Sequence, residues 1–296
     1  MTYSIVARDP ETRQLGVAVQ TAMPAAGATI PWARPGVGVV ATQAIGEPAY
    51  GTWCLDALAA GHDADAALAT AAARDPLPPL RQVAVVGTDG PAAAMTGELC
   101  IDHAGHVVGD GFAVQANMMR STEVWPAMAE AYRHATGPLA RRLLATLVAA
   151  EAAGGDARGR MSAALVVVDG VVPELPGSGV VLDARVDRSD DPLAELTRLV
   201  DVADGYARFH AAVAALMAGD GATALAEADT GLVLLPGETN LEFVRAGALA
   251  AAGETGAAAD QLRALVREQA SWATLARSFA AKGLLTLPEG FSLDDL

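Results

Sequence analysis

Short apolar runs, separated by turn-forming residues, fill the first two thirds of the chain. The clearest pairs are residues 5–7 with 15–19, and residues 82–86 with 92–95. Asp9-Pro10 lies between the first pair and Gly87-Thr88-Asp89-Gly90 between the second. Such residues favour tight turns, so the pattern predicts two β-hairpins. Further strands are expected at 37–42, 107–108, 111–114, 162–168 and 179–182.

Helical signals separate these strands. Leu55, Leu58 and Ala59 share one face of a helix expected over 51–73, with a break after Gly61. An N-cap at Ser121 and a proline at 138 predict two more helices, ending near His134 and Gly154. Hairpins combined with paired helices favour sheets packed against helices over strict βαβ alternation.

Residues 191–296 show no strand signal and are expected to be helical throughout. They also match themselves at an offset of 34 residues, as in Phe209/Phe243 and Gly219/Gly253. This is the period of tetratricopeptide repeats. We therefore expect an all-α, tetratricopeptide-like domain at 191–296 after a mixed domain at 1–190, with an arbitrary helical bundle as the alternative.

Composition narrows the class of protein. The chain has 296 residues, 52% of them hydrophobic, and a formal net charge of −15. A folded core is expected, whereas the acidic surface argues against nucleic acid as a partner. The two cysteines do not make a disulfide framework, and neither a signal sequence nor a membrane helix is evident. These features predict a cytoplasmic protein that neither spans nor binds a membrane.

Thr2 is the first candidate for chemistry. Threonine is small enough for an aminopeptidase to remove Met1, which would leave a threonine with a free α-amine. The hydroxyl is then a nucleophile and the adjacent amine, which titrates near about 8, is its base. If Met1 is retained, this chemistry is lost.

Several segments along 1–190 resemble domain-of-unknown-function family 1028, which is assigned to the N-terminal-nucleophile (Ntn) hydrolase superfamily. They include Thr-Tyr-Ser-Ile-Val-Ala-Arg-Asp-Pro-Glu-Thr at 2–12, Ala-Val-Gln-Ala-Asn-Met-Met at 113–119 and Gly-Gly-Asp-Ala-Arg-Gly-Arg-Met at 154–161. The resemblance implies an α+β fold, a four-layer αββα sandwich with the nucleophile at the start of its first strand. It also implies a helical tail of the kind described as peptidoglycan-binding.

The resemblance suggests roles for two further residues. Arg34, on the approach to the third strand, would lower the pKa of the α-amine through its charge, the alternative being a surface ion pair. No lysine can do this, because Lys282 is the only one. Asn117, at a strand end, would donate to the oxyanion, the alternative being an asparagine that only ends the strand.

Other polar residues are candidates for binding substrate. Ser4 shares the strand face of Thr2 by period two, so it would assist Thr2 or simply bond backbone. Asp156 and the arginines would form either local ion pairs or a guanidinium fork for a carboxylate. The full set is Ser4, Arg8, Gln20, Gln43, Asp156, Arg158 and Arg160.

No cofactor is expected. His103 and His106 are two potential metal ligands without a third at ligand spacing, and no phosphate-binding loop or dinucleotide fingerprint occurs. The resemblance therefore favours an Ntn amidohydrolase that cleaves a small amide or peptide-like substrate, and a homo-oligomer. The alternative is an inactive Ntn fold, with a tail that recognises a peptide or cell-wall fragment.

Overall fold

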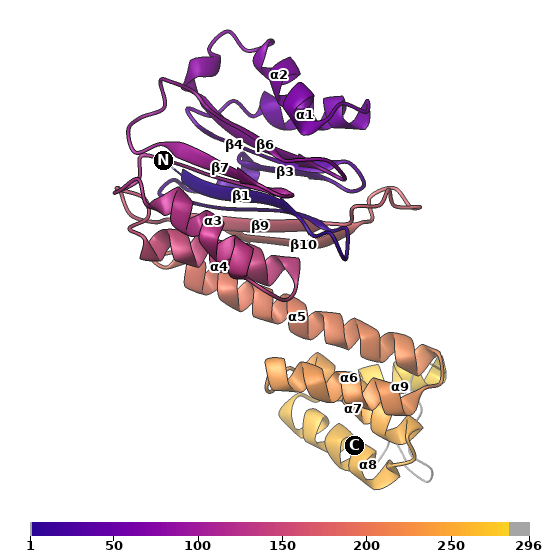
Figure 1. Cartoon of the computed structure of the whole chain (residues 1–296). Helices are drawn as coiled ribbons and strands as arrows, with labels where there is room; N and C mark the ends of the chain where they lie inside the picture. The colour runs from indigo at the N-terminus through magenta and orange to yellow at the C-terminus, as the bar shows by residue number, and fades with distance from the viewer. Residues whose placement is uncertain (1, 284–296) are drawn as a thin grey trace. The chain divides into compact units, whose positions relative to one another are not determined.

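The computed structural model describes residues 2–283 (Figure 1). Its larger sheet has six antiparallel strands in the order β10-β9-β2-β1-β8-β7. The two central strands are therefore β2 and β1, and β1 is the first element of the chain. The strands are β1 (Thr2–Arg8), β2 (Leu15–Thr21), β7 (Gly105–Gly109), β8 (Phe112–Asn117), β9 (Ser162–Val168) and β10 (Val180–Val186).

A smaller sheet of four antiparallel strands, in the order β3-β4-β5-β6, packs on one face of the larger one. Its strands are β3 (Pro31–Arg34), β4 (Gly38–Ala44), β5 (Arg81–Gly87) and β6 (Ala93–Thr96). The contact is spread over several strands, with β1 against β4 and β5, β2 against β3 and β4, and β8 against β5. Val6, Val17 and Val39 belong to the apolar core between the two sheets.

Helices cover the outer face of each sheet (Figure 1). On the smaller sheet lie α1 (Ala49–Ala59) and α2 (Ala64–Ala72), and on the larger sheet α3 (Val124–His134) and α4 (Leu139–Ala152). Short 3-10 turns, η1 (Ala26–Ala28) and η2 (Pro78–Leu80), complete the set. Tyr3 and Ile5 point to the helices while Val6 points to the second sheet, as the alternation of a strand requires.

The chain divides into two compact units at 200/201, within helix α5 (Pro192–Met217). We predicted this boundary ten residues earlier. Leu193, Leu196 and Val200 explain the difference, because they are buried in the core beside α4 and thus belong to the first unit.

The described part of the second unit, up to residue 283, is helical, as predicted. Its further helices are α6 (Gly221–Leu234), α7 (Thr239–Ala251), α8 (Thr255–Glu268) and α9 (Ser271–Ala281). The starts of α6 and α8 lie 34 residues apart. Gly219 and Gly253 precede them with positive φ angles of 79° and 87°, which end the preceding helices. The 34-residue offset in the sequence therefore corresponds to the distance along the chain from one helix pair, α6 and α7, to the next, α8 and α9.

Most predicted elements of the first unit are present. The break expected after Gly61 separates α1 from α2, because Gly61 adopts φ 91° and Asp63 caps α2 by accepting from the Ala66 N–H at 2.8 Å. Strand β3 was not predicted. It begins with Pro31, which an edge strand tolerates because the missing N–H faces no neighbour. Among residues 2–283, no helix has both the length and the apolarity needed to cross a bilayer.

The backbone departs from ordinary geometry where strands end. Ala44, the last residue of β4, has φ 72°, and Met118, directly after β8, has φ 55°. Left-handed geometry costs a residue with a Cβ about 1–2 kcal/mol. Each of these residues follows a buried amide side chain, that of Gln43 or Asn117.

The strain at Ala44 can be measured by substitution. We expect Ala44→Gly to leave the free energy of unfolding unchanged or to raise it by up to about 1 kcal/mol, because glycine adopts φ 72° without steric cost. Ala41→Gly, in the same strand at an ordinary φ, should lower it by at least about 1 kcal/mol. Urea unfolding followed by tryptophan fluorescence compares the two. Equal losses would show that Ala44 is not strained.

Candidate functional site

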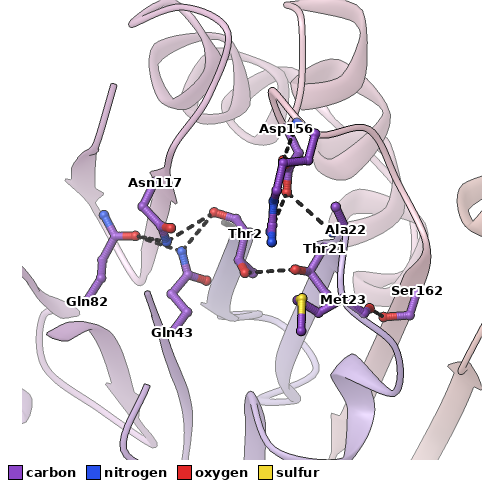
Figure 2. A network of polar contacts seen from close by, with 10 residues as sticks. Thr2, Thr21, Ala22, Met23, Gln43, Gln82, Asn117, Asp156 and Ser162 are labelled. Atoms are coloured by element: carbon purple, nitrogen blue, oxygen red, sulfur yellow. Dashed lines mark hydrogen bonds and ion pairs between the residues drawn. The ribbon is translucent and has the colours of Figure 1, made fainter. Parts of the chain in front are cut away.

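Between the sheets, the core changes from apolar to polar at the end where β1 begins (Figure 2). Every side chain in this region is at most 4% exposed. Burying so many polar groups is costly unless each is hydrogen-bonded. We call the set the polar layer; it comprises Thr2, Ser4, Thr21, Gln43, Gln82, Gln115 and Asn117.

Thr2 lies at the edge of this layer. It pairs in register with Thr21 on β2 and with Asn117 on β8, so its neighbours on both sides are polar. Its hydroxyl donates to the Thr21 hydroxyl at 3.1 Å. Its carbonyl oxygen accepts from Gln43 Nε2 at 3.1 Å and from Asn117 Nδ2 at 3.5 Å. Thr2 is thus bounded by two side-chain amides and one hydroxyl.

Ser4 lies one step deeper on the same face. Its hydroxyl donates to Gln43 Oε1 at 2.7 Å and accepts from Gln115 Nε2 at 3.2 Å. These partners are side chains, so the alternative of a hydroxyl bonded to backbone is wrong. Ser4 is 0% exposed and links Gln43 to Gln115 within the polar layer.

The loop after α4 reaches the same end. An isolated bridge joins Asp156 to Met119, just beyond Asn117. The Asp156 carboxylate is 2% exposed and accepts from the Ala22 N–H at 3.3 Å, beside Thr21 (Figure 2). It also pairs with Arg158, whose Nη2 lies 3.3 Å from Oδ2. The Arg158 side chain is 34% exposed, so it reaches solvent from its ion pair with Asp156.

Two predicted arginines lie at the opposite end of the sheets. Arg34 pairs in register with Gly38, five residues along β4 from Gln43, or roughly 17 Å at the rise of a strand. It forms an ion pair with Asp56 at 2.8 Å, so the surface-pair alternative is the one observed. Arg8 ends β1, six residues from Thr2, or roughly 20 Å. Neither can act on Thr2 from these places.

Two other predicted residues face the helices instead of the polar layer. Gln20 precedes Thr21, so period two turns its side chain away from Thr2, towards the face that carries Tyr3. Arg160 bridges Glu151 at 3.8 Å and Asp191 at 3.4 Å. Glu151 in turn accepts from the Tyr3 hydroxyl at 2.9 Å on that face. Neither residue therefore belongs to the polar layer.

His103, in the loop before β7, and His106, on β7, do not form a metal site with other described residues. His103 Nδ1 lies 2.9 Å from the Met119 carbonyl, and His106 Nδ1 lies 2.8 Å from Thr96 Oγ1. Burial lowers the pKa of His106, which favours the neutral ring. Within residues 2–283, no three His, Cys, Asp or Glu side chains come together as metal ligands would.

Sequence reasoning missed Gln82 and Thr21 and gave Gln115 no role. Gln82 Oε1 accepts from Gln43 Nε2 at 2.8 Å and from Asn117 Nδ2 at 2.9 Å. The available signal was a single glutamine within an apolar run, Gln82 near the start of β5 and Gln115 towards the end of β8. Nothing in that pattern says that strands from two different sheets bring these amides together.

The arrangement combines the Thr2 hydroxyl with side-chain amide donors in a buried region. One Asn117 hydrogen is held by Gln82 at 2.9 Å, while its contact with the Thr2 carbonyl is long at 3.5 Å and therefore weak. The Asn117 hydrogen that makes this weak contact is the one available to the carbonyl oxygen of a bound ligand. The Arg158 guanidinium is suited to a carboxylate.

Comparison with known proteins places the chain in a family. A crystal structure of protein SPO2555 from Silicibacter pomeroyi, described as a DUF1028 protein, is 32% identical, with a TM-score of 0.61. The match covers 67% of this chain and 84% of that one. No curated protein matches. The model of the "Family of unknown function (DUF1028)" matches residues 2–196. The chain therefore belongs to the DUF1028 family.

Proposed function

We propose that the first unit is an Ntn-type amidohydrolase that uses Thr2 as its nucleophile once Met1 has been removed. The observation that carries this proposal is the position of Thr2, at the start of one of the two central strands and in the polar layer between two helix-covered sheets. We propose that these layers are the αββα sandwich of that superfamily. The enzyme would act in the cytoplasm, without a cofactor, on a small amide or peptide-like substrate.

In the proposed reaction, Thr2 Oγ1 attacks the amide carbon and the α-amine of Thr2 takes the hydroxyl proton. Asn117 Nδ2 and backbone N–H groups donate to the oxyanion. The proton then passes to the leaving nitrogen as the C–N bond breaks. Water, activated by the same amine, hydrolyses the acyl-threonine ester and regenerates the hydroxyl.

The surroundings of Thr2 suggest what the substrate carries. Arg158 is the predicted arginine that lies with Asp156 near Thr21 and Ala22, whereas Arg8, Arg34 and Arg160 lie elsewhere. A guanidinium pairs well with a carboxylate. We propose that the substrate places a carboxylate against Arg158.

The second candidate is a binding protein without activity. It is favoured by the regular helix pairs of the second unit, whose 34-residue spacing is that of tetratricopeptide repeats. Such repeats present grooves for peptides. In this case the second unit would bind a peptide or a cell-wall fragment, and the first unit would help to form a homo-oligomer.

Removal of Met1 is the first prediction. Met1 lies outside the described residues, so its fate must be measured on the protein. We expect the intact mass of protein from its native host to be lower than the encoded mass by one methionine residue. A fully retained Met1 would leave Thr2 without a free amine and would favour the binding protein.

Covalent labelling tests Thr2 directly, without knowledge of the substrate. A β-lactone acylates a threonine hydroxyl as its strained ring opens, and the adduct adds the whole reagent to the N-terminal peptide. We expect this adduct on the parent protein and its complete loss in Thr2→Ala. Thr52→Ala is the matched control, because Thr52 is exposed on α1 and bonds only its own helix. Equal labelling of Thr2→Ala and the parent would remove Thr2 from the mechanism.

The rate of this acylation should depend on pH. Only the neutral α-amine can take the hydroxyl proton, and such amines titrate near about 8. The rate should therefore rise with pH through this range and level off above it. A flat profile between pH values of about 6 and 9 would show that the α-amine is not the base.

A further inference from the structure

The side-chain amide of Gln82 is held in one orientation. Its nitrogen Nε2 lies 2.9 Å from Thr96 Oγ1, 3.1 Å from the Gly105 carbonyl and 2.9 Å from the Ala116 carbonyl. Two of these partners are backbone carbonyls, which only accept. A flipped amide would bring its oxygen against both of them, so the nitrogen must lie there.

This orientation directs Gln82 Oε1 towards Thr2's neighbours. The oxygen has two lone pairs, and both are used, by Gln43 Nε2 at 2.8 Å and by Asn117 Nδ2 at 2.9 Å. Gln82 and Gln43 are 2% exposed or less, and Asn117 is 1% exposed, so water does not compete. Because Gln82 Oε1 can only accept, Gln43 and Asn117 must both turn their amide nitrogens towards it.

Both nitrogens also bond the Thr2 carbonyl, at 3.1 Å and 3.5 Å. The oxygen of Gln43 is held separately by the Ser4 hydroxyl at 2.7 Å. The oxygen of Asn117 is buried and has no hydrogen-bond partner among the described residues. The orientation of Asn117 therefore depends on Gln82 and not on any bond of its own oxygen.

We infer that Gln82 is a positioning residue for the Thr2 site, an inference that rests on the proposed function. It lies on β5 of the smaller sheet, while Thr2, Ala116 and Asn117 lie on the larger one. Gln82 thus joins the sheets and fixes the Asn117 amide with its nitrogen towards Thr2. It touches neither the nucleophile nor the reacting carbonyl, so its effect passes through Asn117 and Gln43.

Gln82→Met tests this role, because methionine keeps the length of the side chain and removes all five hydrogen bonds to Nε2 and Oε1. We expect the β-lactone to acylate Thr2 about 10- to 100-fold more slowly, as for other losses of precise placement. Thr146→Val is the control, since Thr146 is buried on α4 and bonds only the Arg142 carbonyl. Its rate should stay within about twofold of the parent.

A second measurement does not depend on activity. In spectra of ¹⁵N-labelled protein, the side-chain NH₂ groups of Gln43 and Asn117 should be slow to exchange with solvent in the parent. In Gln82→Met, the Asn117 signal should lose this protection more than the Gln43 signal, since Ser4 still holds Gln43. Thr146→Val should leave both unchanged.

The outcomes separate the two proposals. A parent rate retained by folded Gln82→Met, or unchanged protection of Asn117, overturns the positioning role. If the parent itself is not acylated, the Thr2 mechanism is wrong, and the NH₂ spectra alone then decide the orientation of Asn117. If Gln82→Met does not fold, Thr96→Val replaces it, because this change removes one of the three acceptors that hold Gln82. Unchanged Asn117 protection in Thr96→Val would likewise overturn the inference.

Discussion

The arrangement of the first unit depends on hydrogen bonds that buried side-chain amides make between its two sheets. Gln43, Gln82 and Gln115 are buried away from water, so their hydrogen bonds are made to other groups of the protein. Gln82 accepts from Gln43 in its own sheet and from Asn117 in the other sheet. Gln115 donates to Ser4 in its own sheet and to the Ala41 carbonyl of β4 in the other. These bonds fix how the two sheets lie against each other, because a slide of one residue, about 3.4 Å along a strand, would take the amides out of hydrogen-bond range.

The two sheets are held together by apolar packing along most of their length and by hydrogen bonds at the end where β1 begins. Around Val6, Val17 and Val39 the sheets are joined by apolar contact, which is tolerant of direction. At the Thr2 end they are joined by hydrogen bonds, which fix direction as well as distance. The positive φ angles of Ala44 and Met118 lie directly after two of the bonded amides. Strained backbone that persists beside an ordered polar cluster is common at functional sites.

The fold was largely readable from the chain. Apolar runs and turn residues gave the two hairpins, the paired helices and the helical second unit, because these features depend on local spacing. Strand β3 was not readable, since Pro31 and the short run after it carry no alternating pattern. The observed unit boundary differs from the predicted one, because Leu196 and Val200 are buried in the core of the first unit, which their own segment does not reveal.

The candidate site was only partly readable. Thr2, Ser4, Gln43, Asn117, Asp156 and Arg158 were predicted together, and the structure brings them to one end of the sheets. Arg8 and Arg34 were placed wrongly, because the position of a residue within its strand decides at which end of the sheet it lies. Gln20 was placed wrongly because the alternation of β2 points it to the helices.

The sequence by itself determined which residue types stand at strand ends and how the helices repeat. It could not determine which strand ends meet, since β1, β2 and β8 pair in one sheet while β4 and β5 pair in another. Only the stacking of these two sheets brings Gln82 within 2.9 Å of Asn117, 35 residues away in the chain. The physical reason is that hydrogen bonds are short and directional, whereas the local pattern of a sequence carries no information on distance across an interface.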